Sequence, residues 1–255
     1  MPGYRISVKR GRGYQLPVLV SVIIISALAA VVSILFWRFH YDGGFSWTSE
    51  PAKQFSWHPL LMTTSLVTMG LGSIIYRVTP CISRLVRLVM KDVEREVTTL
   101  IMPCRKVSKA LHSVVMLCSV GVGVVGVMAV WQSHALAQPP IPHMFSLHSW
   151  LGLTTLIFMA LQLLLGMSVF LLPCAPSRIR AAYHHLHVFC GLAFVMSATA
   201  ASLMGLTEEA IFSLAASYTK LVGKGILLNC IGLFLTIFSA CVIYIAAKPS
   251  FKPLD

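Results

Sequence analysis

The chain has 255 residues, of which 57% are hydrophobic and only 11% are charged, although its net charge is +12. Soluble domains carry roughly 25% charged residues, so this composition excludes an ordinary soluble domain and indicates a membrane protein. The basic excess does not indicate a nucleic-acid-binding protein, because the charges lie in short stretches between long apolar segments.

Six apolar stretches are long enough to cross about 30 Å of hydrocarbon, which takes about 20 helical residues. They are predicted near residues 17–37, 57–78, 110–131, 147–170, 184–206 and 222–245. Their apolar runs are continuous rather than alternating, which favours helices over a β-barrel. The first run is too long for the core of a typical cleaved signal peptide, so it is interpreted as the first span. The predicted fold is therefore an all-α membrane protein with six transmembrane helices.

The positive charges predict how these spans are oriented. Sixteen of the twenty Lys and Arg residues fall at the two termini and in the connections after the second and fourth spans. Because cytosolic loops are enriched in Lys and Arg, residues 1–16 and 246–255 are both predicted to be cytosolic. The four other basic residues lie on the opposite side: Arg38, Lys53, Lys220 and Lys224.

The longest connection, residues 77–109, contains apolar residues at helical spacing over residues 82–100. This pattern fits either a short amphipathic helix on the cytosolic face or a solvated connector. The seven cysteines show no disulfide pattern, since no CxxC pair occurs and the predicted non-cytosolic side has none. Cys118, Cys190, Cys230 and Cys241 lie in apolar segments and are interpreted as small apolar residues. Lipidation is the alternative for two cysteines at the membrane edge, Cys81 and Cys174.

Four histidines lie inside the predicted spans, where an ionisable side chain is costly and indicates a functional site. Each lies near the N-terminal end of its span: His58, His112, His148 and His187. Since consecutive spans run in opposite directions, His58 and His148 share a depth near the non-cytosolic face, and His112 and His187 share one near the cytosolic face. The sequence therefore predicts two histidine pairs. The other five histidines are interpreted as loop residues: His40, His134 and His143 on the non-cytosolic side, and His184 and His185 at the cytosolic mouth of the fifth span.

Two imidazoles that face each other suit bis-histidine ligation of haem iron. Gly152 and Gly191 follow His148 and His187 by one helical turn and would leave room for the macrocycle, although small residues also serve close helix packing. A single histidine could instead be a hydrogen-bonded bundle residue, and His184 is the alternative to His187. Zinc is disfavoured, because no acidic residue lies within a span and the two pairs lie at opposite faces.

These residues resemble the cytochrome b561 family of transmembrane, ascorbate-dependent oxidoreductases, and most closely its compact, six-span "domain-containing" subgroup in animals. The resemblance rests on His58-Pro59, Lys109-x-x-His112, His187-x-x-x-Gly191 and the more specific string Ser146-Leu147-His148-Ser149-Trp150-Leu151-Gly152. Vesicle members of the family carry an Ala-Leu-Arg-Val-Tyr-Arg-like string near the end of the second span. The corresponding region here departs from that string and is Ile74-Ile75-Tyr76-Arg77-Val78.

The resemblance implies a central four-helix bundle, spans two to five, that holds two b-type haems. His58 and His148 would bind the non-cytosolic haem iron, and His112 and His187 the cytosolic one. It implies one-electron transfer from cytosolic ascorbate to monodehydroascorbate or ferric iron on the far side. The membrane would be the endoplasmic reticulum, a vesicle or the plasma membrane. The resemblance also implies a homodimer, a state found among relatives.

Ascorbate is an anion, so a basic pocket is expected beside the cytosolic pair. The candidates are Lys109 and Arg105, one and two turns before His112, followed by Lys106 and Arg180. All four could instead be residues that only set the orientation.

On the outer side, Ser149 and Trp150 are candidates for the acceptor site, with an interface anchor as the alternative for Trp150. Two other functions stay open: a haem-bearing subunit that passes electrons to a partner protein, and a histidine-based transporter. The transporter is less favoured, because it would be expected to have acidic residues within its spans.

Overall fold

The computed structural model describes residues 4–47, 50–89, 105–172 and 175–251. Over these ranges the chain is helical, without strands, and six helices are long and apolar enough to cross a membrane. Continuous apolar runs produce this outcome, because in hydrocarbon a helix satisfies all of its backbone hydrogen bonds within one segment. The prediction of an all-α protein with six membrane-spanning helices is confirmed.

Each predicted span corresponds to one long helix, and most helices extend beyond the span. The long helices are α1 (Tyr4–His40), α3 (Trp57–Val89), α5 (Arg105–Leu136), α6 (Leu147–Gly166), α7 (Ser177–Leu214) and α8 (Gly223–Ala247). The short elements are α2 (Pro51–Phe55), the π-helical turn η2 (Met167–Leu171) and the 3-10 turns η3 (Ala215–Lys220) and η4 (Pro249–Phe251). Of the predicted amphipathic segment, residues 82–89 continue α3, and residues 90–100 lie outside the described ranges.

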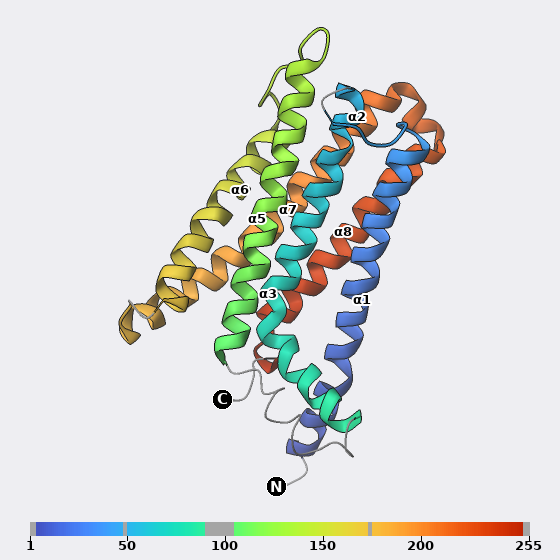
Figure 1. Ribbon diagram of the computed structural model, residues 1–255. Coiled ribbons are helices and arrows are strands. Elements are labelled where there is room, and N and C mark those ends of the chain that lie inside the picture. Colours follow the sequence, from blue (N-terminus) through green and yellow to red (C-terminus); the bar gives the residue numbers. More distant parts are fainter. Residues whose placement is uncertain (1–3, 48–49, 90–104, 173–174, 252–255) are drawn as a thin grey trace.

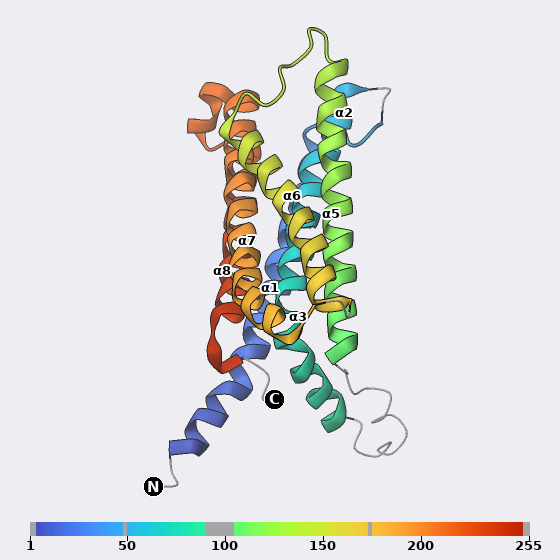
Figure 2. The same cartoon turned by 90° about the vertical axis from the view of Figure 1, so that its left-hand side faces the viewer.

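Four helices close into a central bundle, in which α3 packs against α5, α5 against α6, α6 against α7, and α7 against α3. The remaining two long helices, α1 and α8, pack against each other and against α3, and α8 also contacts α7 (Figures 1 and 2). The histidine-bearing helices are therefore the four of the bundle, with α1 and α8 covering one side of it.

The two ends of the bundle differ in what they carry. Helix α1 begins and η4 ends at one end, hereafter the terminal end, where α5 and α7 also begin (Figure 1). The opposite end, hereafter the α2 end, carries α2, η3 and the connection from α5 to α6 (Figure 2). Helices α3 and α6 thus start at the α2 end, and α5 and α7 start at the terminal end.

Among the described residues, the seam between α1, α3 and α8 is densely buried. Trp37 and Phe238 are almost completely buried there. Gly70 of α3 permits this approach, because a Cβ atom at Gly70 would lie 2.6 Å from Cζ of Phe238. A buried hydrogen bond of 2.6 Å between the hydroxyls of Thr199 and Ser239 joins α7 to α8. These contacts hold α1 and α8 firmly against the bundle.

Candidate functional site

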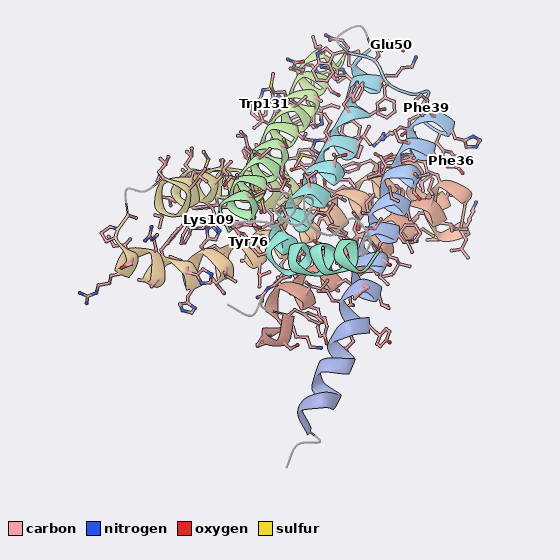
Figure 3. All side chains as sticks on the ribbon, turned by 60° about the horizontal axis from the view of Figure 1, so that its bottom comes forward. Phe36, Phe39, Glu50, Tyr76, Lys109 and Trp131 are labelled. Carbon is pink, nitrogen blue, oxygen red and sulfur yellow. The ribbon has the colours of Figure 1, made fainter. Side chains whose placement is uncertain are left out.

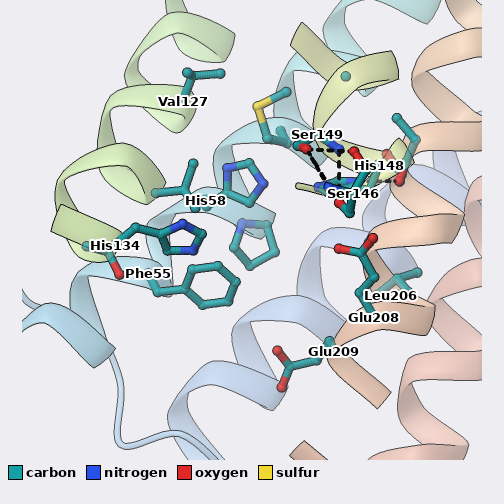
Figure 4. A pocket seen from close by; sticks show the side chains of 18 of the residues that line it. Phe55, His58, Val127, His134, Ser146, His148, Ser149, Leu206, Glu208 and Glu209 are labelled. Atoms are coloured by element: carbon teal, nitrogen blue, oxygen red, sulfur yellow. Dashed lines mark hydrogen bonds between the residues drawn. The ribbon is translucent and has the colours of Figure 1, made fainter. Parts of the chain in front are cut away.

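His58 and His148 form one histidine pair at the α2 end, hereafter the α2-end pair. They lie in the first turns of α3 and α6, on opposite sides of a pocket (Figure 4). Their ring centres are 6.0 Å apart, with the ring planes at 88°. Nδ1 of His58 donates to the Gly126 carbonyl at 3.0 Å, and Nδ1 of His148 donates to the Ala201 carbonyl at 2.7 Å. A carbonyl oxygen can only accept, so each proton lies on Nδ1 and each Nε2 is available to bind a metal.

His112 and His187 form a second pair at the other end, hereafter the terminal-end pair. Their ring centres are 6.1 Å apart, with the ring planes at 68°. Nδ1 of His112 donates to the Gly72 carbonyl at 2.9 Å. His187, and not His184, is the α7 histidine that faces His112, and its backbone carbonyl accepts a 2.8 Å hydrogen bond from Gln162.

The hydrogen bonds across α3 and α5 show how far apart the two pairs lie. Fourteen residues separate His58 from Gly72 on α3, and fourteen separate His112 from Gly126 on α5. At 1.5 Å of rise per residue this is about 21 Å along the bundle. This separation is comparable with the thickness of about 30 Å of a bilayer's hydrocarbon core, so the two pairs lie toward opposite ends of the bundle.

The spacing of both pairs fits a haem iron between the rings. A first-row metal binds an imidazole nitrogen at about 2 Å, so one iron between two imidazoles would hold the ring centres about 6 Å apart. Both observed separations match this value. Three of the four rings also have the required tautomer, because their Nδ1 atoms are bonded to carbonyls.

There is also room for a macrocycle beside the α2-end pair. A cavity of about 1090 Å³ is lined by both His58 and His148, and pockets for organic ligands measure about 300–1,000 Å³. Gly152 lines it as predicted, and the nearest atom to a Cβ placed there is 3.9 Å away. The same distance is found at Gly191 near the terminal-end pair. The residues present therefore fit a haem.

Two glycines that the sequence did not single out make room for the histidine rings themselves. A Cβ atom at Gly205 would lie 2.7 Å from Cε1 of His148, and one at Gly166 would lie 3.0 Å from Cε1 of His187. Both glycines lie opposite a histidine on a neighbouring helix, a relation that only the packed bundle reveals. Gly126, by contrast, packs closely against α3, where its Cβ would lie 3.0 Å from Sδ of Met62.

The two predicted acceptor-site residues differ in their placement. Ser149 lines the cavity and forms a capping box with Ser146, in which each backbone N–H donates to the other hydroxyl at 3.3 Å (Figure 4). This cap begins α6 immediately before His148. Trp150 is 62% exposed, does not line the cavity, and donates to the Met144 carbonyl at 2.7 Å. The placement of Trp150 favours the interface anchor.

The loop prediction is wrong for His134, which lies in the last turn of α5 and lines the cavity. It stacks with Phe55, at 6.4 Å between ring centres, and with His143, at 5.5 Å. His143 in turn stacks on Trp131 at 4.0 Å. The sequence signal for this aromatic cluster is the spacing of Trp131 and His134, which are one helical turn apart on α5. The loop prediction is also wrong for three further helical residues, His40, His184 and His185.

At the terminal end, Lys109 lies beside the terminal-end pair. Its Nζ donates to the Phe170 carbonyl at 3.3 Å, and the Phe170 ring lies 5.3 Å from that of His187. Tyr76, 5.7 Å from the His112 ring, belongs to the same end of the bundle (Figure 3). The other candidates are less defined: Arg180 is half-buried in the first turn of α7, and the side chains of Arg105 and Lys106 lie outside the described part.

Comparison with known proteins adds to this geometry. A family model described as eukaryotic cytochrome b561 matches residues 93–213. The plasma membrane ascorbate-dependent reductase of Xenopus laevis is 35% identical over 94% of this chain and 78% of its own length. The lysosomal membrane ascorbate-dependent ferrireductase of Bos taurus is 33% identical, over 87% of this chain and 77% of its own length. The transmembrane ascorbate-dependent reductase of Sus scrofa is 31% identical over 85% of this chain and 76% of its own length.

Proposed function

Because the chain belongs to the cytochrome b561 family, we propose that it transfers single electrons across a membrane, from cytosolic ascorbate to monodehydroascorbate or ferric iron on the other side. The observation that supports this most strongly is the pair of histidine layers, about 21 Å apart, in which each ring separation fits one iron. The names of the relatives supply the ascorbate dependence and, for the lysosomal one, the ferric acceptor.

Membership of the family implies haem b, and four histidines would hold two such groups. His58 and His148 are proposed as the ligands near the non-cytosolic face, and His112 and His187 as the ligands near the cytosolic face. Haem b supplies a reversible one-electron carrier when it is bound. The protein orients three of the four imidazoles, those of His58, His112 and His148, through carbonyl hydrogen bonds at Nδ1, which also raise the basicity of Nε2.

The donor side requires attraction of an anion. Lys109 is the best-placed cation, because it lies next to Phe170, which contacts His187. Arg105, Lys106 and Arg180 begin α5 and α7 at the same end and would add to the positive potential. A basic entrance of this kind raises the local concentration and association rate of an anionic donor. On the acceptor side, Ser149 is proposed to contact the acceptor from the cavity wall.

Orientation and direction follow from charge. The concentration of Lys and Arg at the terminal end supports a cytosolic location for both termini. The relatives reside in plasma and lysosomal membranes, and the plasma membrane or an endomembrane is proposed here. Moving one charge across the membrane changes its free energy by about 2.3 kcal/mol per 100 mV, so the supply of donor and acceptor sets the net direction. We also propose that the protein forms a homodimer, as some members of the cytochrome b561 family do.

The test uses the purified protein in sealed proteoliposomes that enclose a ferric chelate, with ascorbate added outside. Ferrous iron should appear inside only in vesicles that contain the protein, and His112→Ala should abolish it. A protein that ascorbate reduces but that passes no electron to the enclosed acceptor would favour the alternative, a subunit that serves a protein partner.

A further inference from the structure

The last turn of α1 presents hydrogen-bond donors to the cavity that have no acceptor. Trp37 and Arg38 are 1% and 3% exposed and line the same cavity as His58. Nε1 of Trp37 and both Nε and Nη2 of Arg38 are buried without a hydrogen-bond partner among the described residues. A buried donor left without a partner costs about 1–3 kcal/mol, so three of them around one cavity indicate that an acceptor belongs there.

The free atoms of Arg38 define the kind of acceptor. Nε and Nη2 form one edge of the guanidinium, and such an edge binds a carboxylate through two parallel hydrogen bonds. The other edge is occupied, because Nη1 donates to Asp42 at 2.6 Å. The guanidinium also stacks on Trp37, 3.6 Å from the ring centroid. Arg38 is therefore held rigidly while the carboxylate-binding edge stays free.

The surrounding charges leave that edge without a protein carboxylate. Lys224 lies 3.0 Å from Asp42 and 2.8 Å from Glu209, so these two carboxylates are held by Lys224 and by Nη1 of Arg38. The two cations and two anions balance each other within this cluster. No carboxylate of the described residues forms a hydrogen bond with Nε or Nη2 of Arg38.

The position of Arg38 connects it to the α2-end pair through one aromatic ring. The guanidinium lies 5.1 Å from the centroid of the Phe55 ring, and the Phe55 ring lies 6.0 Å from that of His58. Figure 4 shows Phe55 beside His58 at the pocket wall. A carboxylate at the edge of a flat group centred between His58 and His148 would thus be one ring away from the free guanidinium edge.

We propose that Nε and Nη2 of Arg38, together with Nε1 of Trp37, bind a propionate carboxylate of the non-cytosolic haem b. The inference rests on the proposed function, because it requires a haem between His58 and His148. A guanidinium on a propionate places positive charge near the iron, and nearby charge and hydrogen bonds set haem potentials. Arg38 is a positioning and tuning residue in this account, and it favours the reduced form of one haem only.

The experiment compares full-length haem-loaded variants by resonance Raman spectroscopy and by spectroelectrochemical titration of each haem. Arg38→Met should keep both haems, shift the propionate bending bands of one, and lower the reduced-to-oxidised ratio of that haem at a fixed potential by up to about tenfold, equivalent to about 59 mV. Arg38→Lys should restore most of the ratio but not the bands, because it keeps the charge and loses the two parallel bonds.

Two controls separate this role from general effects. Arg38→Met combined with Asp42→Asn preserves the net charge and leaves no unpaired Asp42 carboxylate, so it provides the comparison if the single variant does not fold. It should still shift the bands. Lys53→Met removes a cation from an exposed pair with Glu50 at the same end of the bundle, and it should change neither haem.

Wild-type bands and potentials in the Arg38 variants, or a shift confined to the cytosolic haem, would overturn the inference while leaving the proposed function intact. A wild-type protein without haem at His58 and His148 would defeat both.

Discussion

Gly205→Ala should remove haem from the α2-end pair while leaving the terminal-end pair loaded. A Cβ at this position would lie 2.7 Å from Cε1 of His148, whereas ordinary contacts begin at 3.4 Å, so the ring has to move by 0.7 Å. Moving the ring strains the 2.7 Å hydrogen bond from its Nδ1 to the carbonyl of Ala201 on α7, the helix that also carries Gly205. A metal–imidazole bond of about 2 Å does not stretch by this amount.

The fold itself should not suffer from this substitution. Alanine within a helix is favoured over glycine by about 1 kcal/mol, so loss of haem would not reflect a weaker α7. The hydrogen bond to Ala201 contributes only about 0.5–1.5 kcal/mol, and the displaced ring could give it up. The expected result is a fall from two haems per chain to one, measured from extracted haem and protein concentration, with the reduced-minus-oxidised band halved.

Two matched variants test whether haem loss depends on how far the added Cβ atom displaces the histidine ring. Gly166→Ala would place a Cβ 3.0 Å from Cε1 of His187, which requires a shift of only 0.4 Å to reach 3.4 Å, so the terminal-end pair should be perturbed less. Gly121→Ala adds a methyl group where nothing lies within 4 Å and should change nothing. Two haems with an unchanged spectrum in Gly205→Ala would refute the reasoning that ring position at His148 depends on this glycine.

Three further predictions follow from the same contacts. Lys109→Ala should slow reduction by ascorbate about tenfold at low salt with an unaltered spectrum in stopped-flow measurements; an unchanged rate would leave Lys109 with a role in orientation only. His112→Ala or His187→Ala should each leave one haem per chain and block reduction from the cytosolic side, and two haems in either variant would disprove the assignment. Lys224→Met should lower the free energy of unfolding in detergent by about 2 kcal/mol, because two partly buried carboxylates lose their shared cation. The more exposed pair lost in Lys53→Met should matter by less than about 1 kcal/mol, and equal losses in the two variants would contradict the role given to Lys224.

The sequence predicted the architecture well, because hydropathy reports directly on what lies in hydrocarbon. It did not predict how far a helix continues beyond its span: the second span was predicted to end near residue 78, and α3 continues to Val89. Charged residues mark the membrane edge, but they do not stop a helix. The string at residues 146–152 led to a family that the relatives confirm, while membership of the "domain-containing" subgroup stays a prediction.

The histidine pairs could be placed because depth follows from position within antiparallel spans. What the sequence could not supply is which side chains meet across helices. Arg38 counted only as one of four basic residues on the non-cytosolic side, and its burial depends on how α1 packs against the bundle. Gly205 and His134 were missed for the same reason, since their neighbours His148 and Phe55 lie far away in the chain.

The most direct test of the account is the number of b-type haems per chain in the purified full-length protein, with ascorbate as the only reductant. Two haems per chain, both reduced by ascorbate, are expected from the two facing imidazole pairs. A protein that is colourless after expression with ample haem would contradict the proposal that these pairs hold iron.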